Sequence, residues 1–191
     1  MFNDNVIDVE SYPIVFDKLK LKMELGFLLK KYPWHPHSNQ LSLVHTGEYE
    51  DPADQIYDGI GSIIKPGLDN RLNRVYREGK EKEKFTHLHP AVKNTYFEFV
   101  INKVREFSTK PIGRIRLMML RSKTCCSWHK DDDLIRYHVP IITNPRCFIV
   151  TEHGLYTMET EGKLYSLVST AMHTAMNASQ DDRVHLLFDT I

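Results

Sequence analysis

The sequence lacks an excess of charge of either sign, because its 191 residues include 25 lysines and arginines and 25 aspartates and glutamates. Proteins that bind nucleic acid through its phosphates usually carry a basic excess, so the composition disfavours a nucleic-acid partner. No apolar run approaches the roughly 18 residues that are needed to cross a bilayer. The first residues also lack the basic and apolar segments of a secretory signal. We therefore expect a cytoplasmic protein without a membrane partner.

Cysteine is scarce, with only Cys125, Cys126 and Cys147 in the chain. An odd number of cysteines in a chain of this length is not typical of a disulfide framework. There is no Cys-x-x-Cys pair, which is the usual element of a thiolate zinc site. We expect three reduced thiols. Histidine, by contrast, is plentiful, with ten residues.

The length and the 41% of hydrophobic residues predict a single domain over residues 1–191. Apolar residues between Ile14 and Leu28 predict a short strand or coil and then a helix that ends near Tyr32, because Pro33 disfavours its continuation. Residues 34–90 are rich in proline, glycine and aspartate, which predicts loops. They form either a substrate-binding insertion or a surface excursion.

A helix is predicted over Pro90 to Phe107, where apolar residues recur every three or four positions. We treat residues 1–110 as a helical and loop-rich N-terminal elaboration. After residue 110 the pattern changes to short alternating runs separated by turn residues. This pattern predicts that residues 111–191 form the main part of an antiparallel jelly roll, in a fold that is mostly β with flanking helices. The predicted strands are 114–121, 135–142, 147–151, 155–159, 163–169 and 183–189.

Two histidines and an aspartate have the pattern of a metal site. His129 and Asp131 are two residues apart, so they share a face of an extended chain, and His173 follows 44 residues later. Two imidazoles and one carboxylate with open positions are the facial arrangement that holds non-haem Fe(II). Asp132 and Asp133 also follow His129, but we interpret them as a solvated acidic turn.

Two further pairs, His35 with His37 and His87 with His89, have the same spacing and are interpreted as surface or loop histidines.

Polar residues also alternate on two predicted strands. Arg183 and His185 share one face of the last strand, and Arg136 and His138 share one face of an earlier strand. The planar guanidinium group of an arginine can donate two parallel hydrogen bonds to the two oxygens of a carboxylate. Such a row inside a barrel is costly unless its groups are satisfied, and a bound dianion and a metal would satisfy them.

From about Arg114 to Asp189 the sequence resembles the aspartyl/asparaginyl β-hydroxylase family of Fe(II)/2-oxoglutarate dioxygenases, which includes proline hydroxylases that act on the free amino acid. The resemblance lies in the order and spacing of four motifs: Trp128-His129-Lys130-Asp131, Arg136-Tyr137-His138-Val139-Pro140, His173-Thr174-Ala175-Met176-Asn177 and Asp182-Arg183-Val184-His185-Leu186-Leu187-Phe188-Asp189. One departure concerns a serine that the family often places before the first ligand, because no serine in residues 117–122 aligns with it.

The resemblance implies a double-stranded β-helix core, of the jelly-roll or cupin-like kind. It implies that His129, Asp131 and His173 are the catalytic iron ligands. It further implies that Arg183 binds the distal carboxylate of 2-oxoglutarate and that Arg136 and His138 face this co-substrate. The implied reaction uses dioxygen, converts 2-oxoglutarate to succinate, and hydroxylates an aliphatic carbon of an amino acid or amino-acid residue of the Asp, Asn or Pro type.

Two alternatives are a non-catalytic metal-binding jelly-roll module and a nucleic-acid-modifying dioxygenase. The convergence of four polar groups argues against the first, and the zero net charge argues against the second. The substrate is expected to be a free amino acid or a peptide or protein, and residues 1–110 should determine which. His185 is a candidate pocket residue. Asn177 either supports His173 or caps a turn.

Overall fold

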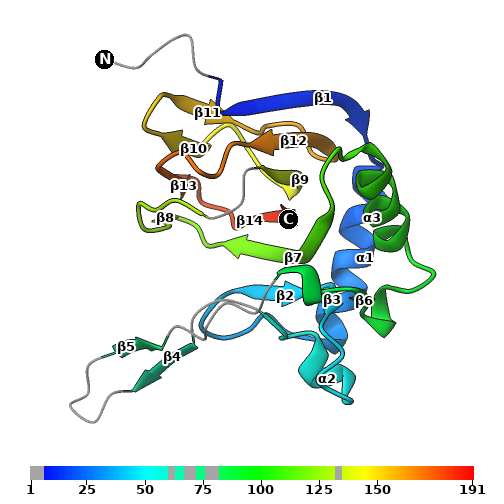
Figure 1. The fold of residues 1–191 in the computed structure, drawn as a ribbon. Helices are drawn as coiled ribbons and strands as arrows, with labels where there is room; N and C mark the ends of the chain where they lie inside the picture. The colour runs from blue at the N-terminus through cyan, green and yellow to red at the C-terminus, as the bar shows by residue number, and fades with distance from the viewer. Residues whose placement is uncertain (1–6, 60–62, 67–71, 76–81, 132–134) are drawn as a thin grey trace.

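The chain folds into two antiparallel β-sheets that face each other, with two helices on the outer side of the larger sheet (Figure 1). The computed structural model describes residues 7–59, 63–66, 72–75, 82–131 and 135–191. The larger sheet has the order β1-β12-β9-β14-β7-β2, and the smaller sheet has the order β11-β10-β13-β8. The strands of the larger sheet are β1 (Val9–Val15), β12 (Lys163–Leu167), β9 (Arg136–Ile142), β14 (Arg183–Thr190), β7 (Ile112–Leu120) and β2 (Gln40–Ser42). Those of the smaller sheet are β11 (Leu155–Thr157), β10 (Cys147–Thr151), β13 (His173–Asn177) and β8 (Thr124–Cys125).

The remaining elements are short and lie between β2 and the second long helix. They include two-stranded pairs of β3 with β6 and of β4 with β5. This agrees with the prediction of a loop-rich region at 34–90. In chain order they are β3 (Val44–His45), α2 (Pro52–Gln55), β4 (Ile63–Pro66), β5 (Leu72–Val75), the 3-10 turns η1 (Lys82–Lys84) and η2 (Pro90–Val92), and β6 (His87–Leu88), which lies between the two turns.

The first helix, α1 (Lys18–Lys31), begins and ends as the sequence predicts. The carboxylate of Asp17 accepts hydrogen bonds from the backbone amides of Leu19 and Lys20, which caps the helix. The helix ends before Tyr32, whose backbone is extended ahead of Pro33.

The second long helix, α3 (Tyr96–Phe107), begins later than predicted. Pro90 starts only the short η2 turn, because Asn94 adopts a left-handed backbone conformation with φ 61° and interrupts the helical path. Thr95 then precedes the first turn of α3. The predicted helix over Pro90 to Phe107 is therefore wrong in its first turn.

Alternation along β14 separates the apolar core from the barrel interior. Val184, Leu186 and Phe188 pack with the buried face of α1 and with α3, in one cluster with the outward residues of β7 and β9. Arg183, His185 and Asp189 have the opposite parity and point between the two sheets. The predicted class, mostly β with flanking helices, is confirmed, whereas β13, which carries His173, was not predicted as a strand.

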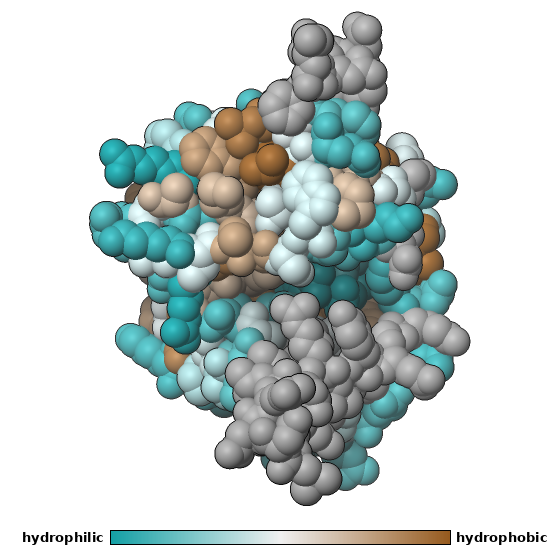
Figure 2. Space-filling view, turned by 90° about the vertical axis from the view of Figure 1, so that its left-hand side faces the viewer, coloured by the Kyte–Doolittle hydropathy of each residue, from teal (hydrophilic) through white to brown (hydrophobic). Residues whose placement is uncertain are grey.

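The outer face of the smaller sheet is covered by no helix among the described residues (Figure 1). Figure 2 views this side of the molecule and shows hydrophobic side chains gathered over it. Leu155 and Met176 are among its exposed residues. In the part of the chain that the structure describes, no helix is long and apolar enough to span a membrane.

Candidate metal centre and adjoining polar pocket

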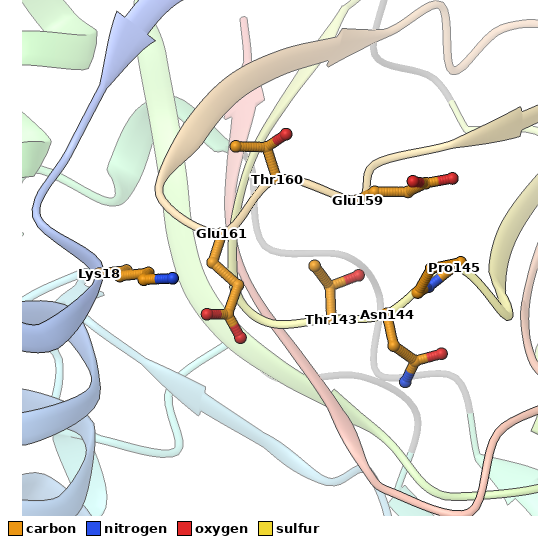
Figure 3. Close-up of a pocket in the computed structure, with 7 residues that line it drawn as sticks. All are labelled: Lys18, Thr143, Asn144, Pro145, Glu159, Thr160 and Glu161. Carbon is orange, nitrogen blue, oxygen red and sulfur yellow. The ribbon is translucent and has the colours of Figure 1, made fainter.

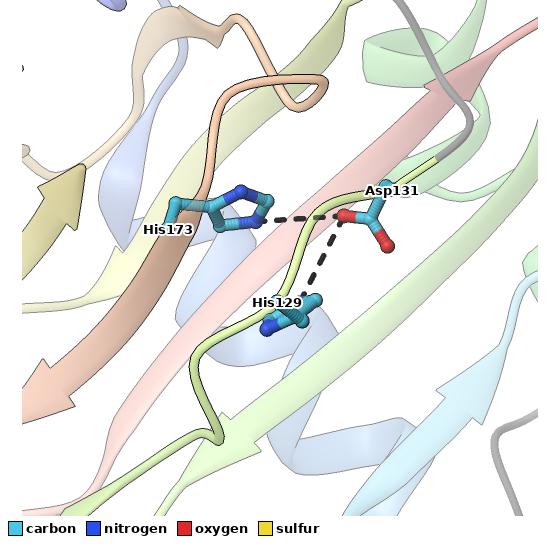
Figure 4. Close-up of side chains that lie close together, drawn as sticks. All are labelled: His129, Asp131 and His173. Atoms are coloured by element: carbon cyan, nitrogen blue, oxygen red, sulfur yellow. Dashed lines mark ion pairs between the residues drawn. The ribbon is translucent and has the colours of Figure 1, made fainter. Parts of the chain in front are cut away.

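The two predicted histidines and the predicted aspartate lie together at one end of the barrel (Figure 4). His129 and His173 pair through reciprocal backbone hydrogen bonds of 3.0 and 2.7 Å, which brings their segments side by side. Asp131 Oδ2 lies 3.5 Å from His173 Nε2 and 3.9 Å from His129 Nε2. One ligand atom from each residue lies within 4.8 Å of the others, so the three side chains could hold a metal ion.

Backbone carbonyls orient both imidazoles. His129 Nδ1 lies 2.6 Å from the carbonyl oxygen of Ser127, and His173 Nδ1 lies 2.9 Å from that of Ala171. A carbonyl can only accept, so Nδ1 is the donor in both rings, and Nε2 is the nitrogen left to face the site. Both Nε2 atoms are therefore placed to bind a metal, in the arrangement that metal-binding histidines usually have.

The Asp131 carboxylate is held by Arg136. Arg136 Nη1 donates to Asp131 Oδ2 over 2.7 Å, while Arg136 Nε donates to Asp189 Oδ1 over 2.6 Å. Burial raises the pKa of Asp131, but the His173 hydrogen bond and the Arg136 charge outweigh burial and lower it well below its usual value. Asp131 is thus ionised and ready to coordinate a cation. Arg136, which was predicted to face the co-substrate, contacts these two carboxylates.

Asp189 is the centre of this charged network and was not predicted as a site residue. Its carboxylate is fully buried and accepts two hydrogen bonds from Arg114, through Nε and Nη2, each 2.7 Å long. It also accepts the hydrogen bond from Arg136 Nε described above, and Arg116 Nη2 lies 3.5 Å from its Oδ2 atom. Burial raises the pKa of Asp189, but the three guanidinium groups reverse the shift and lower it well below its usual value. The alternating arginines of β7, two residues apart, are the sequence signal that could have revealed this network.

Arg183 lies deeper in the barrel, where no described residue is an anionic partner for it. It is 2% exposed, its Nε has no hydrogen-bond partner, and the described residues form no ion pair with it. Burial lowers the pKa of its guanidinium. An unpaired buried cation is costly unless a ligand neutralises it.

Two buried histidines lie between Arg183 and the metal end. His138 Nδ1 and His185 Nδ1 are 3.3 Å apart, and the Nε2 atom of each ring has no partner. Burial lowers the pKa of both rings well below the ordinary value, so both are neutral. Only one Nδ1 can donate in their shared hydrogen bond, so one Nε2 is a donor and the other an acceptor. The pair thus offers one donor and one acceptor to a ligand.

Other predicted residues have structural roles or lie elsewhere. Asn177 donates to the carbonyl oxygens of Leu120, Arg121 and Asp181 and does not contact His173, which supports the turn-capping alternative. His89 is fully buried and caps η2, so it is not a surface residue. Asp132 and Asp133 lie outside the described residues. The three cysteines are free thiols, as predicted.

A separate surface pocket of about 490 Å³ shares no residue with the metal centre (Figure 3). Its walls come from the start of α1, the turn after β9 and the turn before β12. Lys18, Thr143 and Glu161 are among its lining residues.

Comparison with protein families gives one match, to the family model described as aspartyl/asparaginyl beta-hydroxylase, over residues 74–191. The chain belongs to this family. The region that matches the β-hydroxylase family begins before Arg114, where the resemblance in sequence begins. It includes the three residues of the metal centre and the buried residues Arg136, His138, Arg183, His185 and Asp189. A search of curated proteins finds no match.

Solved structures show that the β-hydroxylase domain described here has the fold of 2-oxoglutarate oxygenases. One match is the viral collagen prolyl hydroxylase of Paramecium Bursaria Chlorella virus-1 in its 2OG complex. That match has 9% identity and a TM-score of 0.55, and it covers 97% of this chain and 96% of that one. Another is an oxidoreductase of the 2OG-Fe(II) oxygenase family from Burkholderia pseudomallei, with 12% identity and a TM-score of 0.52, covering 97% and 84%. The predicted double-stranded β-helix core is thereby confirmed.

Proposed function

We propose that this member of the β-hydroxylase family is an Fe(II)/2-oxoglutarate-dependent dioxygenase. It hydroxylates an aliphatic carbon of an amino acid or of an amino-acid residue of the Asp, Asn or Pro type. The co-substrates are dioxygen and 2-oxoglutarate, and the latter is decarboxylated to succinate.

The donor set at the barrel end supports Fe(II). Two imidazoles that each direct Nε2 toward Asp131, together with the ionised Asp131 carboxylate, match the three-ligand face of non-haem Fe(II) oxygenases. Bound there, iron supplies the oxidising chemistry. The chain itself orients the three ligands through the carbonyls of Ser127 and Ala171 and through Arg136.

The buried cation of Arg183 carries the assignment of the co-substrate. Its guanidinium lies in the interior with an unpartnered Nε, on the same face of β14 as the unpartnered Nε2 of His185. A dicarboxylate that reaches from the metal to Arg183 would neutralise the cation and give Nε an acceptor. A structural barrel gains nothing from an unpaired buried guanidinium, which disfavours a non-catalytic metal-binding module.

Apolar side chains lie beside these polar groups in the barrel interior. Leu187 lies between Arg116 and His138 in the register of the larger sheet and is 2% exposed. Ile149, Tyr165 and Leu167 form a second buried cluster between the two sheets. A dry interior strengthens the attraction between Arg183 and a carboxylate, because charges interact more strongly at low dielectric constant.

Succinate release measured with Fe(II), 2-oxoglutarate and a panel of free amino acids and peptides tests this function. We expect His129→Ala and His173→Ala to abolish release, because each removes a metal ligand. We expect Arg183→Ala to raise the KM for 2-oxoglutarate roughly 10- to 100-fold, which corresponds to the loss of charged hydrogen bonds. The matched controls are the exposed residues His37 and Arg121, whose alanine variants should retain wild-type values.

Three outcomes separate the candidate functions. Full activity in all three site variants would contradict the proposal. Metal binding without any succinate release in the wild type would favour the non-catalytic module. Release stimulated by a polynucleotide and suppressed by salt would favour a nucleic-acid substrate.

A further inference from the structure

Arg116 of β7 is another inward-facing guanidinium, separate from Arg183. The strand register places it beside Leu187 of β14 on one side and Ser42 of β2 on the other. His138 lies on the far side of Leu187, so Arg116 and His138 are two strands apart, or roughly 10 Å. Arg183 pairs with Leu120, four residues further along β7. Arg116 is therefore on the β2 side of the barrel interior, away from Arg183 and His138, which are assigned to 2-oxoglutarate.

The charge of Arg116 is poorly compensated. The residue is 7% exposed, and its Nε has no hydrogen-bond partner. Nη2 is 3.5 Å from Asp189, a carboxylate already bonded at shorter distances by Arg114 and Arg136. Burial, followed by the nearby charge of Arg114, lowers the pKa of Arg116 to about 9. Among the described side chains, Arg116 therefore shares Asp189 with two closer arginines and has no carboxylate of its own.

Gln40 fixes the direction of this guanidinium. Arg116 Nη1 donates to Gln40 Oε1 over 3.2 Å, and both residues are buried. Gln40 belongs to β2, the edge strand that the N-terminal region adds to the larger sheet. An amide acceptor orients the arginine without neutralising it, which leaves its charge and its Nε available to an anion.

We propose that Arg116, oriented by Gln40, binds a carboxylate of the substrate, so that the hydroxylated amino-acid unit carries a free carboxylate. This proposal rests on the proposed function. The carboxylate is either the α-carboxylate of a free amino acid or the side chain of an aspartyl residue. A neutral asparaginyl or prolyl residue within a peptide would leave the guanidinium unpaired.

Binding to protein loaded with Mn²⁺ and 2-oxoglutarate, measured by titration calorimetry, tests the proposal without turnover. Two ligand pairs distinguish the sources of the carboxylate: L-proline against L-prolinamide, and N-acetyl-aspartyl amide against N-acetyl-asparaginyl amide. We expect the wild type to bind the carboxylate member of one pair roughly 10- to 100-fold more tightly than its amide, the range for a charged hydrogen bond. Arg116→Gln should remove this preference while 2-oxoglutarate affinity stays within about twofold.

Gln40→Glu is a second variant that keeps Arg116 in place. The new carboxylate would pair with Nη1 and compete with the substrate, so the preference should also fall in this variant. Arg121→Gln, the same change at an exposed position beyond β7, should keep it.

Equal binding of acid and amide in both pairs, or no binding of any of the four probes, would overturn the proposal. An unchanged preference in Arg116→Gln would do so as well, and a matching loss of 2-oxoglutarate affinity would assign Arg116 to the co-substrate. Failure of the wild type to bind 2-oxoglutarate at all would instead contradict the proposed function.

Discussion

Replacing Arg183 with methionine tests the co-substrate site without catalysis. The guanidinium is 2% exposed, and the described residues offer it no carboxylate. Replacing buried ionic groups with apolar side chains of similar volume can stabilise a protein by about 1–4 kcal/mol, and we take about 1–3 kcal/mol for this single unpaired cation. At about 2–4 °C per kcal/mol for a chain of this size, the ligand-free Arg183→Met variant should unfold about 2–12 °C above the wild type.

The ligand should reverse this order. With Mn²⁺ present and 2-oxoglutarate at a thousand times its dissociation constant, the wild type gains about 4.1 kcal/mol, which exceeds the whole range expected for the ligand-free difference. The variant should gain little, because it has lost the group that binds the distal carboxylate. Thermal unfolding of both proteins with and without 2-oxoglutarate measures the effect, and Arg121→Met at an exposed position is the control. A ligand-free variant that is less stable than the wild type would refute the view that Arg183 lacks a partner in the fold.

Three further predictions concern stability. Asp189→Asn should lower the free energy of unfolding by about 3–5 kcal/mol, because it leaves three guanidinium groups around a neutral amide. Urea denaturation measures this free energy. The control Asp181→Asn, at an exposed position, should change it little. Because His138 and His185 stay neutral in the fold, stability should be full above about pH 6.5 and fall below it by up to about 1.4 kcal/mol per pH unit for each ring. His185→Gln should remove about half of this slope in urea titrations, and an unchanged slope would contradict the assignment. Gly162→Ala should lower the melting temperature, because the backbone of Gly162 has a φ of +79° and a Cβ there would overlap the carbonyl oxygen of Phe16. Gly26→Ala in α1 is the matched control. A Cβ at Gly26 has no other atom within 4 Å, so this change should stabilise the protein by about 0.5–1 kcal/mol.

The metal centre could be predicted because its signal is local. His129 and Asp131 are two residues apart in an extended segment. The number of residues between His173 and Arg183 also matches the spacing of the family motifs. The alternation of β14 likewise predicted that Arg183 and His185 share a face, and the register confirms it. The limits of the predicted strands followed from the same period of two, and none of them differs from the structure by more than two residues.

The groups that hold the three metal ligands in place could not be predicted in the same way, because their positions depend on the register between strands that are far apart in sequence. Arg136 has the expected position, yet it contacts Asp131 and Asp189, a pairing that alternation alone does not specify. The carbonyls that orient His129 and His173 belong to backbone, which leaves no trace in residue type. The late start of α3 depends on one left-handed residue, Asn94, in an otherwise helical pattern.

The boundary near residue 110, which separates two sequence patterns, does not separate the N-terminal region from the barrel. β1 and β2 both come from before it, and they form the two edges of the larger sheet. β2 brings Gln40 to Arg116, so the region without catalytic motifs reaches the pocket that the motifs define. Since Gln40 contacts Arg116 and not Arg183, changes in the N-terminal region should alter the choice of substrate more than the affinity for 2-oxoglutarate. Exchange of Gln40 for leucine should therefore change amino-acid binding while leaving the KM for 2-oxoglutarate within about twofold, and an equal change in both would argue against this division of the pocket.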